Sequence, residues 1–156
     1  RGLKKNEGFK VMQQKVFERF IELASCSNKP LLIHSRGAWK ECLEMVRNSG
    51  IEKAVFHWFS GSLTVLKELL KEGYYISASP AAEYSIYHQK AIRHTPIDRI
   101  LLETDSPVKY HDLISEPAYL NKSLKAVAEL KNLKPETVAE TTTRNAAKLF
   151  SLEDLV

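Results

Sequence analysis

Cysteine is scarce in this chain of 156 residues, and long hydrophobic runs are absent. The two cysteines, Cys26 and Cys42, have no CxxC pair or Cys/His pair beside them, which argues against a zinc knuckle and a redox dithiol. No stretch approaches the roughly 20 apolar residues of a membrane span, and no charged leader precedes the apolar segment of a signal peptide. We therefore expect a cytoplasmic protein with reduced thiols and no membrane contact.

A large excess of one charge is also lacking. The net charge is +4, and the basic residues are scattered along the chain, so charge favours anionic partners such as nucleic acid only weakly. Hydrophobic residues make up 44% and charged residues 27% of the sequence, which is typical of a globular protein with one core. The sequence predicts a single domain over residues 1–156.

Short apolar runs alternate with segments of helical periodicity. Runs too short for helices and apolar on both faces predict buried parallel strands, and the spacing of roughly 20 to 25 residues between them is that of βα units. The predicted strands cover about 31–35, 54–59, 74–79 and 99–104. The predicted helices cover about 9–25, 37–48, 63–71, 83–94, 117–131 and 135–150, and an irregular loop covers 106–115. The fold class is therefore α/β with a parallel sheet.

Three side chains that can bind metal stand at the ends of such runs. His34, His57 and Asp105 each close a short apolar run. Because the carboxyl ends of parallel strands meet at one edge of a sheet, we expect these groups to converge. Imidazole and carboxylate are the usual donors of a hydrolytic metal site, and Asp105 can also accept a proton from the attacking water. The alternative is two core histidines and a turn aspartate.

Four ordered motifs resemble those of one family. The chain is similar to TatD-like metal-dependent deoxyribonucleases in His34-Ser35-Arg36, His57-Trp58-Phe59-Ser60-Gly61, Glu103-Thr104-Asp105-Ser106-Pro107 and the final Asn145 to Phe150. The resemblance implies a TIM-type (β/α)8 barrel that cleaves phosphodiester bonds with one or two divalent metal ions. It implies that His34, His57 and Asp105 bind the metal and that DNA is the substrate. Magnesium, zinc and manganese are not distinguished by the sequence.

The resemblance covers only part of such a barrel. The family carries a His-x-His pair on its first strand and a bridging glutamate after its fourth, and the five histidines here include no such pair. Gly2-Leu3 resembles the segment that follows that glutamate. Because a full barrel needs about 250 residues, we expect about four βα units, the carboxyl-terminal half of a TIM-type barrel. Four explanations for the missing half stay open: a complementary half from another chain, self-association of two copies, a split gene and a truncation. We expect the chain alone to bind metal weakly.

Further residues near the predicted strand ends are candidates for binding substrate or supporting the metal ligands. Arg36 is placed to grip a phosphate or to form a salt bridge. Ser60 offers a hydroxyl at a helix start or serves as a plain N-cap. Glu103 shares a strand face with Asp105 and is predicted to orient a metal ligand, or to pair with a cation inside the barrel.

The loop after the last predicted strand is a second candidate region. Lys109, with Tyr110 and His111, suits contact with nucleic acid by charge and stacking, and a solvated loop is the alternative. His88 and His94 are expected on the surface of a helix outside the barrel. Two other functions also fit the sequence: a non-catalytic half-barrel that acts as an assembly partner, and an amidohydrolase that attacks a cyclic amide or ester.

Overall fold

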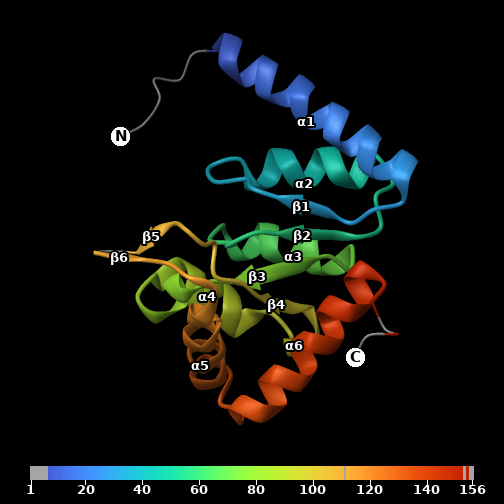
Figure 1. Ribbon diagram of the computed structural model, residues 1–156. Coiled ribbons are helices and arrows are strands. Elements are labelled where there is room, and N and C mark those ends of the chain that lie inside the picture. Colours follow the sequence, from blue (N-terminus) through green and yellow to red (C-terminus); the bar gives the residue numbers. More distant parts are fainter. Residues whose placement is uncertain (1–6, 111, 153, 155–156) are drawn as a thin grey trace.

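The computed structural model describes residues 7–110, 112–152 and 154 (Figure 1). Its centre is a parallel sheet of four strands in the order β1-β2-β3-β4, which follows the order of the chain. The strands are β1 (Leu31–Ile33), β2 (Ala54–Phe56), β3 (Tyr75–Ala78) and β4 (Ile100–Leu102). The predicted α/β class is confirmed. Gly2-Leu3, used for the family alignment, lies outside the described residues.

Helices alternate with these strands. They are α1 (Glu7–Ser27), α2 (Trp39–Asn48), α3 (Leu63–Lys71), α4 (Ile86–His94), α5 (Leu120–Lys131) and α6 (Pro135–Phe150). The predicted helix over 83–94 is divided into a 3₁₀ turn at Pro80–Glu83 and α4, and the predicted irregular loop contains a small hairpin, β5 (Lys109–Tyr110) and β6 (Leu113–Ile114). In the described part of the chain, no helix is long and apolar enough to cross a membrane.

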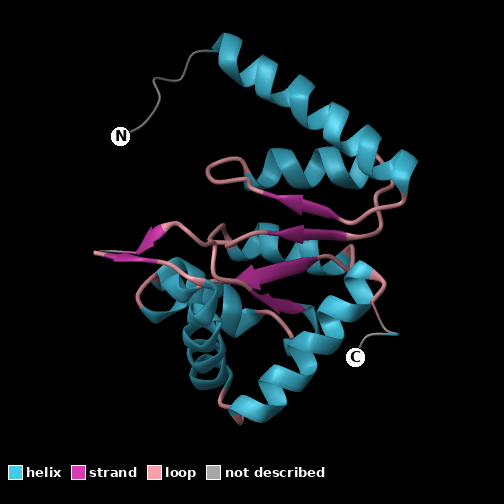
Figure 2. Cartoon of the chain, in the orientation of Figure 1, coloured by secondary structure: helices cyan, strands magenta, loops and turns pink. Residues whose placement is uncertain are grey.

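The strands end earlier than predicted, at the last apolar residue of each run. Figure 2 shows that all four point toward the side on which the β5–β6 hairpin lies. The predicted strand ends, His34 and His57, follow β1 and β2 and belong to the loops at that edge. The chain therefore leaves the sheet just where its polar side chains begin, which places those side chains at one rim.

The main core lies between the sheet and the helices. The register aligns Ile33, Phe56, Ile76 and Ile100 across all four strands, and each is at most 2% exposed. Burying a side chain of this size stabilises a fold by about 1.5 to 3 kcal/mol. This row therefore anchors the four strands that lead to the site.

The opposite face of the sheet is only partly covered. Val55, Tyr75 and Leu101 pack there with Leu149 of α6. Leu32, which is in register with Val55 on edge strand β1, is 63% exposed. In a closed barrel this face would be interior. The described residues cover it around Leu149 of α6 and leave Leu32 on β1 exposed.

Helix α1 is confirmed, but its apolar stripe is mostly uncovered. Ile21 and Ala24 near its end are buried in the core, whereas Phe9, Met12 and Phe20 are between 57% and 63% exposed. Figure 1 shows the first half of α1 extending away from the rest of the molecule. The sequence periodicity predicted the helix, and within residues 7–110, 112–152 and 154 most of its apolar face is left uncovered.

Candidate active site

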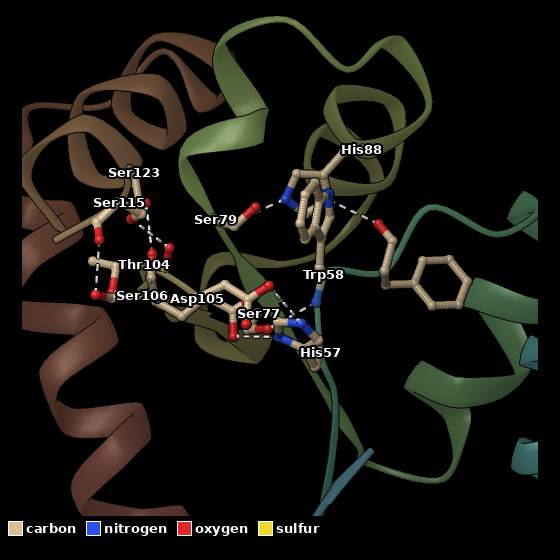
Figure 3. A network of polar contacts seen from close by, with 12 residues as sticks. His57, Trp58, Ser77, Ser79, His88, Thr104, Asp105, Ser106, Ser115 and Ser123 are labelled. Atoms are coloured by element: carbon tan, nitrogen blue, oxygen red, sulfur yellow. Dashed lines mark hydrogen bonds and ion pairs between the residues drawn. The ribbon is translucent and has the colours of Figure 1, made fainter. Parts of the chain in front are cut away.

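The centre of the site is His57, which lies just after β2 and is 8% exposed. Its Nδ1 lies 2.7 Å from Oε2 of Glu103, and its Nε2 lies 3.4 Å from Oδ2 of Asp105 (Figure 3). Burial alone would lower the pKa of His57, but the hydrogen bond and charge of Glu103, with a contribution from Asp105, raise it above its ordinary value. Two carboxylates from the end of β4 therefore hold one imidazole from the end of β2.

The structure places His34 beside this cluster. Its ring centroid is 5.4 Å from that of His57, and its side chain is exposed after edge strand β1. The predicted convergence at one rim is thus seen in the positions of His34, His57 and Asp105. Within residues 7–110, 112–152 and 154, however, no three His, Cys, Asp or Glu side chains form a group that could hold a metal ion.

The donors present suit part of a metal site. Imidazole and carboxylate ligands are appropriate for zinc and related divalent ions. Oε1 of Glu103 is buried and makes no hydrogen bond within the described structure, so it keeps lone pairs that a cation would satisfy. The chemistry of the residues therefore fits a divalent ion, while the number of converging donors is too small to enclose one.

Two strained residues set the direction of these side chains. Trp58 and Asp105 have φ values of +47° and +50°, in the left-handed region that non-glycine residues rarely adopt. The backbone N–H of Trp58 donates to Oγ of Ser77 at 3.0 Å, which fixes the turn after His57. These sharp turns allow His57 and Asp105 to face each other across the sheet edge.

A pocket of about 350 Å³ opens beside the two histidines. Arg36 and Ser60, both predicted from sequence, line it together with His34 and His57. The complete lining is His34, Arg36, Trp39, His57, Trp58, Ser60, Tyr84 and Ser85. Trp39, Tyr84 and Ser85 were not predicted from the sequence as site residues. The last two lie in the segment after β3, and the position of that segment at the same sheet edge was the available signal.

The alternatives for Arg36 and Ser60 can be compared with the structure. In the described part of the chain Arg36 is exposed and forms no ion pair, so the salt-bridge alternative has no partner among those residues. Ser60 is not an N-cap: the N-cap of α3 is Ser62, whose Oγ accepts a hydrogen bond from the N–H of Val65 at 3.3 Å.

The hairpin residues separate into two kinds. Lys109 is exposed and lies 3.9 Å from Asp112, away from the pocket lining. Tyr110 is buried, its ring 5.3 Å from that of Trp58, and burial raises the pKa of its hydroxyl. Both alternatives for Tyr110, stacking on nucleic acid and a solvated loop, are therefore wrong, because its ring packs inside the protein. His111 lies outside the described residues.

The predicted surface position of His88 is also wrong. Its side chain is completely buried, with Nδ1 2.8 Å from the carbonyl of Phe59 and Nε2 3.3 Å from the N–H of Ser79. It thereby joins the loop after β2 to the loop after β3. His94, on the same helix, is exposed as expected.

Comparison with known proteins identifies the family. The sequence model described as TatD related DNase matches residues 2–151. The chain belongs to the TatD-related DNase family. A metal-dependent hydrolase of Buchnera aphidicola, named as uncharacterized, is 36% identical over 157 residues, covering 95% of this chain and 59% of that protein. The human deoxyribonuclease TATDN3 is 36% identical over 140 residues, covering 88% of this chain and 51% of its own length.

Solved TatD-family structures share the fold. The TatD homologue YjjV of Escherichia coli superposes with a TM-score of 0.83 at 23% identity, over 90% of this chain and 57% of that one. A TatD-family hydrolase of Entamoeba histolytica gives 0.77 at 18% identity, over 88% and 56%. The chain therefore spans a little over half the length of these TatD relatives, and its four βα units match about half of a TatD barrel.

Proposed function

We propose that this chain provides the carboxyl-terminal half of the active site of a metal-dependent hydrolase that cleaves phosphodiester bonds in DNA. The observation that carries the proposal is the contact of His57 with both Glu103 and Asp105, at the rim of a pocket that also holds His34 and Arg36. Membership of the TatD-related DNase family supports the choice of reaction.

The residues around His57 bind the metal, position a ligand or accept a proton in this proposal. His34, His57 and Asp105 are donors to one or two divalent ions, and Glu103 orients His57 through its Nδ1. When bound, such an ion lowers the pKa of a coordinated water and polarises the phosphate. Asp105 accepts the proton of the attacking water.

The pocket side chains bind the substrate in this proposal. The Arg36 guanidinium pairs with a phosphate oxygen, and Ser60 donates a hydrogen bond to it. Lys109, on the exposed hairpin, adds positive charge on the approach of DNA without entering the pocket.

The remaining ligands are proposed to come from a complementary half-barrel. The sheet is open at β1 and β4, its inner face is partly uncovered, and three donors do not enclose an ion. A second polypeptide segment that closed the barrel would bring ligands to the same rim. A second copy of the chain is the alternative source.

The decisive experiment measures cation-dependent DNA cleavage by the chain alone and by the chain fused to the amino-terminal half of the Buchnera aphidicola relative. Magnesium, zinc and manganese are each added after chelation. We expect cleavage by the fusion only, and loss of cleavage when His57 is replaced by Ala. His94→Ala is the matched control, because His94 is an exposed histidine on α4.

The other candidate functions predict different results. No cleavage by the fusion with any cation would contradict the proposal and favour a non-catalytic half-barrel. Hydrolysis of cyclic amides or esters in the same assay, with DNA left intact, would favour the amidohydrolase alternative.

A further inference from the structure

The backbone after β4 is held by side-chain hydroxyls. Residues Glu103 and Thr104 leave the sheet, and hydroxyl groups bond to both of their carbonyls. The Ser123 hydroxyl donates to the Glu103 carbonyl at 2.7 Å, and the Ser115 hydroxyl donates to the Thr104 carbonyl at 2.8 Å (Figure 3). The Tyr110 hydroxyl donates to the same Thr104 carbonyl at 3.1 Å. Three hydroxyls, two from the β5–β6 hairpin and one from α5, thus converge on two consecutive peptide groups.

The side chains that carry these hydroxyls are buried, and their hydrogen bonds to the two carbonyls are partly buried. Ser115 is 2% exposed, and Ser123 and Tyr110 are also buried. A buried carbonyl without a partner is costly, so each bond restricts the peptide group that accepts it. The arrangement is therefore more rigid than a loop in water.

The hairpin that carries two of the hydroxyls is itself bonded to the same segment. Ser106 donates its hydroxyl to the carbonyl of Ser115 at 2.9 Å, and the N–H of Ser115 donates to the carbonyl of Val108 at 2.9 Å. The N–H of Val108 in turn donates to the carbonyl of Asp105 at 2.8 Å. The end of β4 and the β5–β6 hairpin therefore form one hydrogen-bonded unit.

This unit controls the orientation of a carboxylate in the site. The Thr104 carbonyl belongs to the peptide plane that joins Thr104 to Asp105, and the N–H of Val108 holds the next plane through the Asp105 carbonyl. Holding both planes constrains the left-handed φ of +50° at Asp105, which is one of the rotations between them. That angle aims the Asp105 side chain at Nε2 of His57, and the adjoining Glu103 holds Nδ1 of the same ring. Loss of the hydroxyls would release the plane and loosen the grip of both carboxylates on the imidazole.

We propose that Ser115 and Tyr110 are positioning residues, which hold the Thr104 carbonyl and thereby fix Asp105 and Glu103 around His57. The proposal rests on the proposed function for its catalytic meaning. Ser115 was not predicted from the sequence, and for Tyr110 contact with nucleic acid and a solvated loop were the two alternatives. The structure instead turns the hydroxyl of Tyr110 toward the backbone beside the site.

The test follows the Nδ1 proton of His57 by NMR in the chain, at neutral pH and without added metal. This proton lies in the bond to Glu103, so its exchange with solvent reports how firmly the ring is held. Losing both hydroxyls in a Tyr110→Phe/Ser115→Ala double variant is expected to speed its exchange by about ten-fold, as the loss of one to two net hydrogen bonds would do.

A matched control separates positioning from general stability. Thr142 is a buried residue of α6 whose hydroxyl also donates to a backbone carbonyl, that of Val138 at 2.8 Å, away from the site. Thr142→Val should lower the thermal midpoint without changing the exchange of the His57 proton. Tyr110→Phe alone keeps the ring against Trp58, so it carries the test if the double variant does not fold.

The outcomes decide the proposal. Unchanged exchange of the His57 Nδ1 proton in a folded double variant would overturn the proposal, and so would an equal acceleration in Thr142→Val. If the double variant does not fold, unchanged exchange of the same proton in Tyr110→Phe would overturn it. The measurement uses neither metal nor DNA. Absence of DNA cleavage in the fusion experiment would therefore defeat the proposed function while leaving this result readable.

Discussion

Replacing His88 by leucine gives the sharpest test of how the two loops beside the site are joined. The Nδ1–H group of His88 donates to the carbonyl of Phe59, and its Nε2 accepts from the N–H of Ser79. These two bonds specify one neutral tautomer. Leucine fills much of the same space but satisfies neither backbone group.

The expected magnitude follows from those two groups. Phe59 and Ser79 are completely buried, and a buried polar group left without a partner costs about 1 to 3 kcal/mol. The His88→Leu variant should therefore lose about 2 to 6 kcal/mol of unfolding free energy. A loss of about 4 kcal/mol in a domain of this size lowers the thermal midpoint by roughly 8 to 16 °C.

Thermal and urea unfolding measure this loss. His94→Leu is the control, because it removes an exposed histidine from the same helix and should change the unfolding free energy by less than about 0.5 kcal/mol. Equal midpoints for the wild-type chain and His88→Leu would refute the reasoning, since they would mean that Phe59 and Ser79 find other partners.

The same histidine predicts a dependence of stability on pH. Burial holds the pKa of His88 below its ordinary value of 6.5, although the bond to the Phe59 carbonyl opposes this. Protonation would also place an N–H against the N–H of Ser79. The unfolded chain therefore protonates His88 more readily than the folded chain does. The contribution of neutral His88 to the unfolding free energy is complete above pH 6.5 and is lost as the pH falls through the lower pKa that His88 has in the folded chain.

Comparison with a His88→Gln variant isolates this effect. His57 has a raised pKa and acts in the opposite direction, but it is present in both proteins. The wild-type chain should lose more unfolding free energy than the variant on acidification. Parallel pH profiles for the two proteins would contradict the buried neutral tautomer.

Three further substitutions test other parts of the structure. Gly61→Ala places a Cβ 2.7 Å from the Phe59 ring and should lower the unfolding free energy by about 1 to 3 kcal/mol in urea titrations. The Asn145 amide donates to the carbonyls of Ile97 and Ile100, each at 2.8 Å. Asn145→Ala removes this donor and should lower the unfolding free energy by about 1 to 3 kcal/mol for each carbonyl, measured by calorimetry. Phe20→Lys on the uncovered face of α1 should reduce binding of a hydrophobic dye while changing the unfolding free energy by less than about 0.5 kcal/mol, and unchanged dye binding would contradict an exposed apolar face.

Much of the site's location, but little of its detail, could be predicted. His34, His57 and Asp105 were placed at one rim because strand ends are recognisable from short apolar runs. The contact of Glu103 with His57 matches the predicted orienting role in geometry, but which ring nitrogen each carboxylate meets was not predictable. Those contacts join residues 46 and 48 positions apart, and they depend on how the left-handed turns aim the side chains.

The sequence by itself determined the order of helices and strands and the polar residues that follow each strand, because periodicity and turn chemistry act over a few neighbouring residues. Only the tertiary structure decided the burial of His88, the packing of Tyr110 under Trp58 and the uncovered stripe of α1. Each of these depends on what a distant segment places opposite, or does not place there. A helical or loop pattern records that a side chain is apolar or polar, but its partner is set by the packing of the whole sheet.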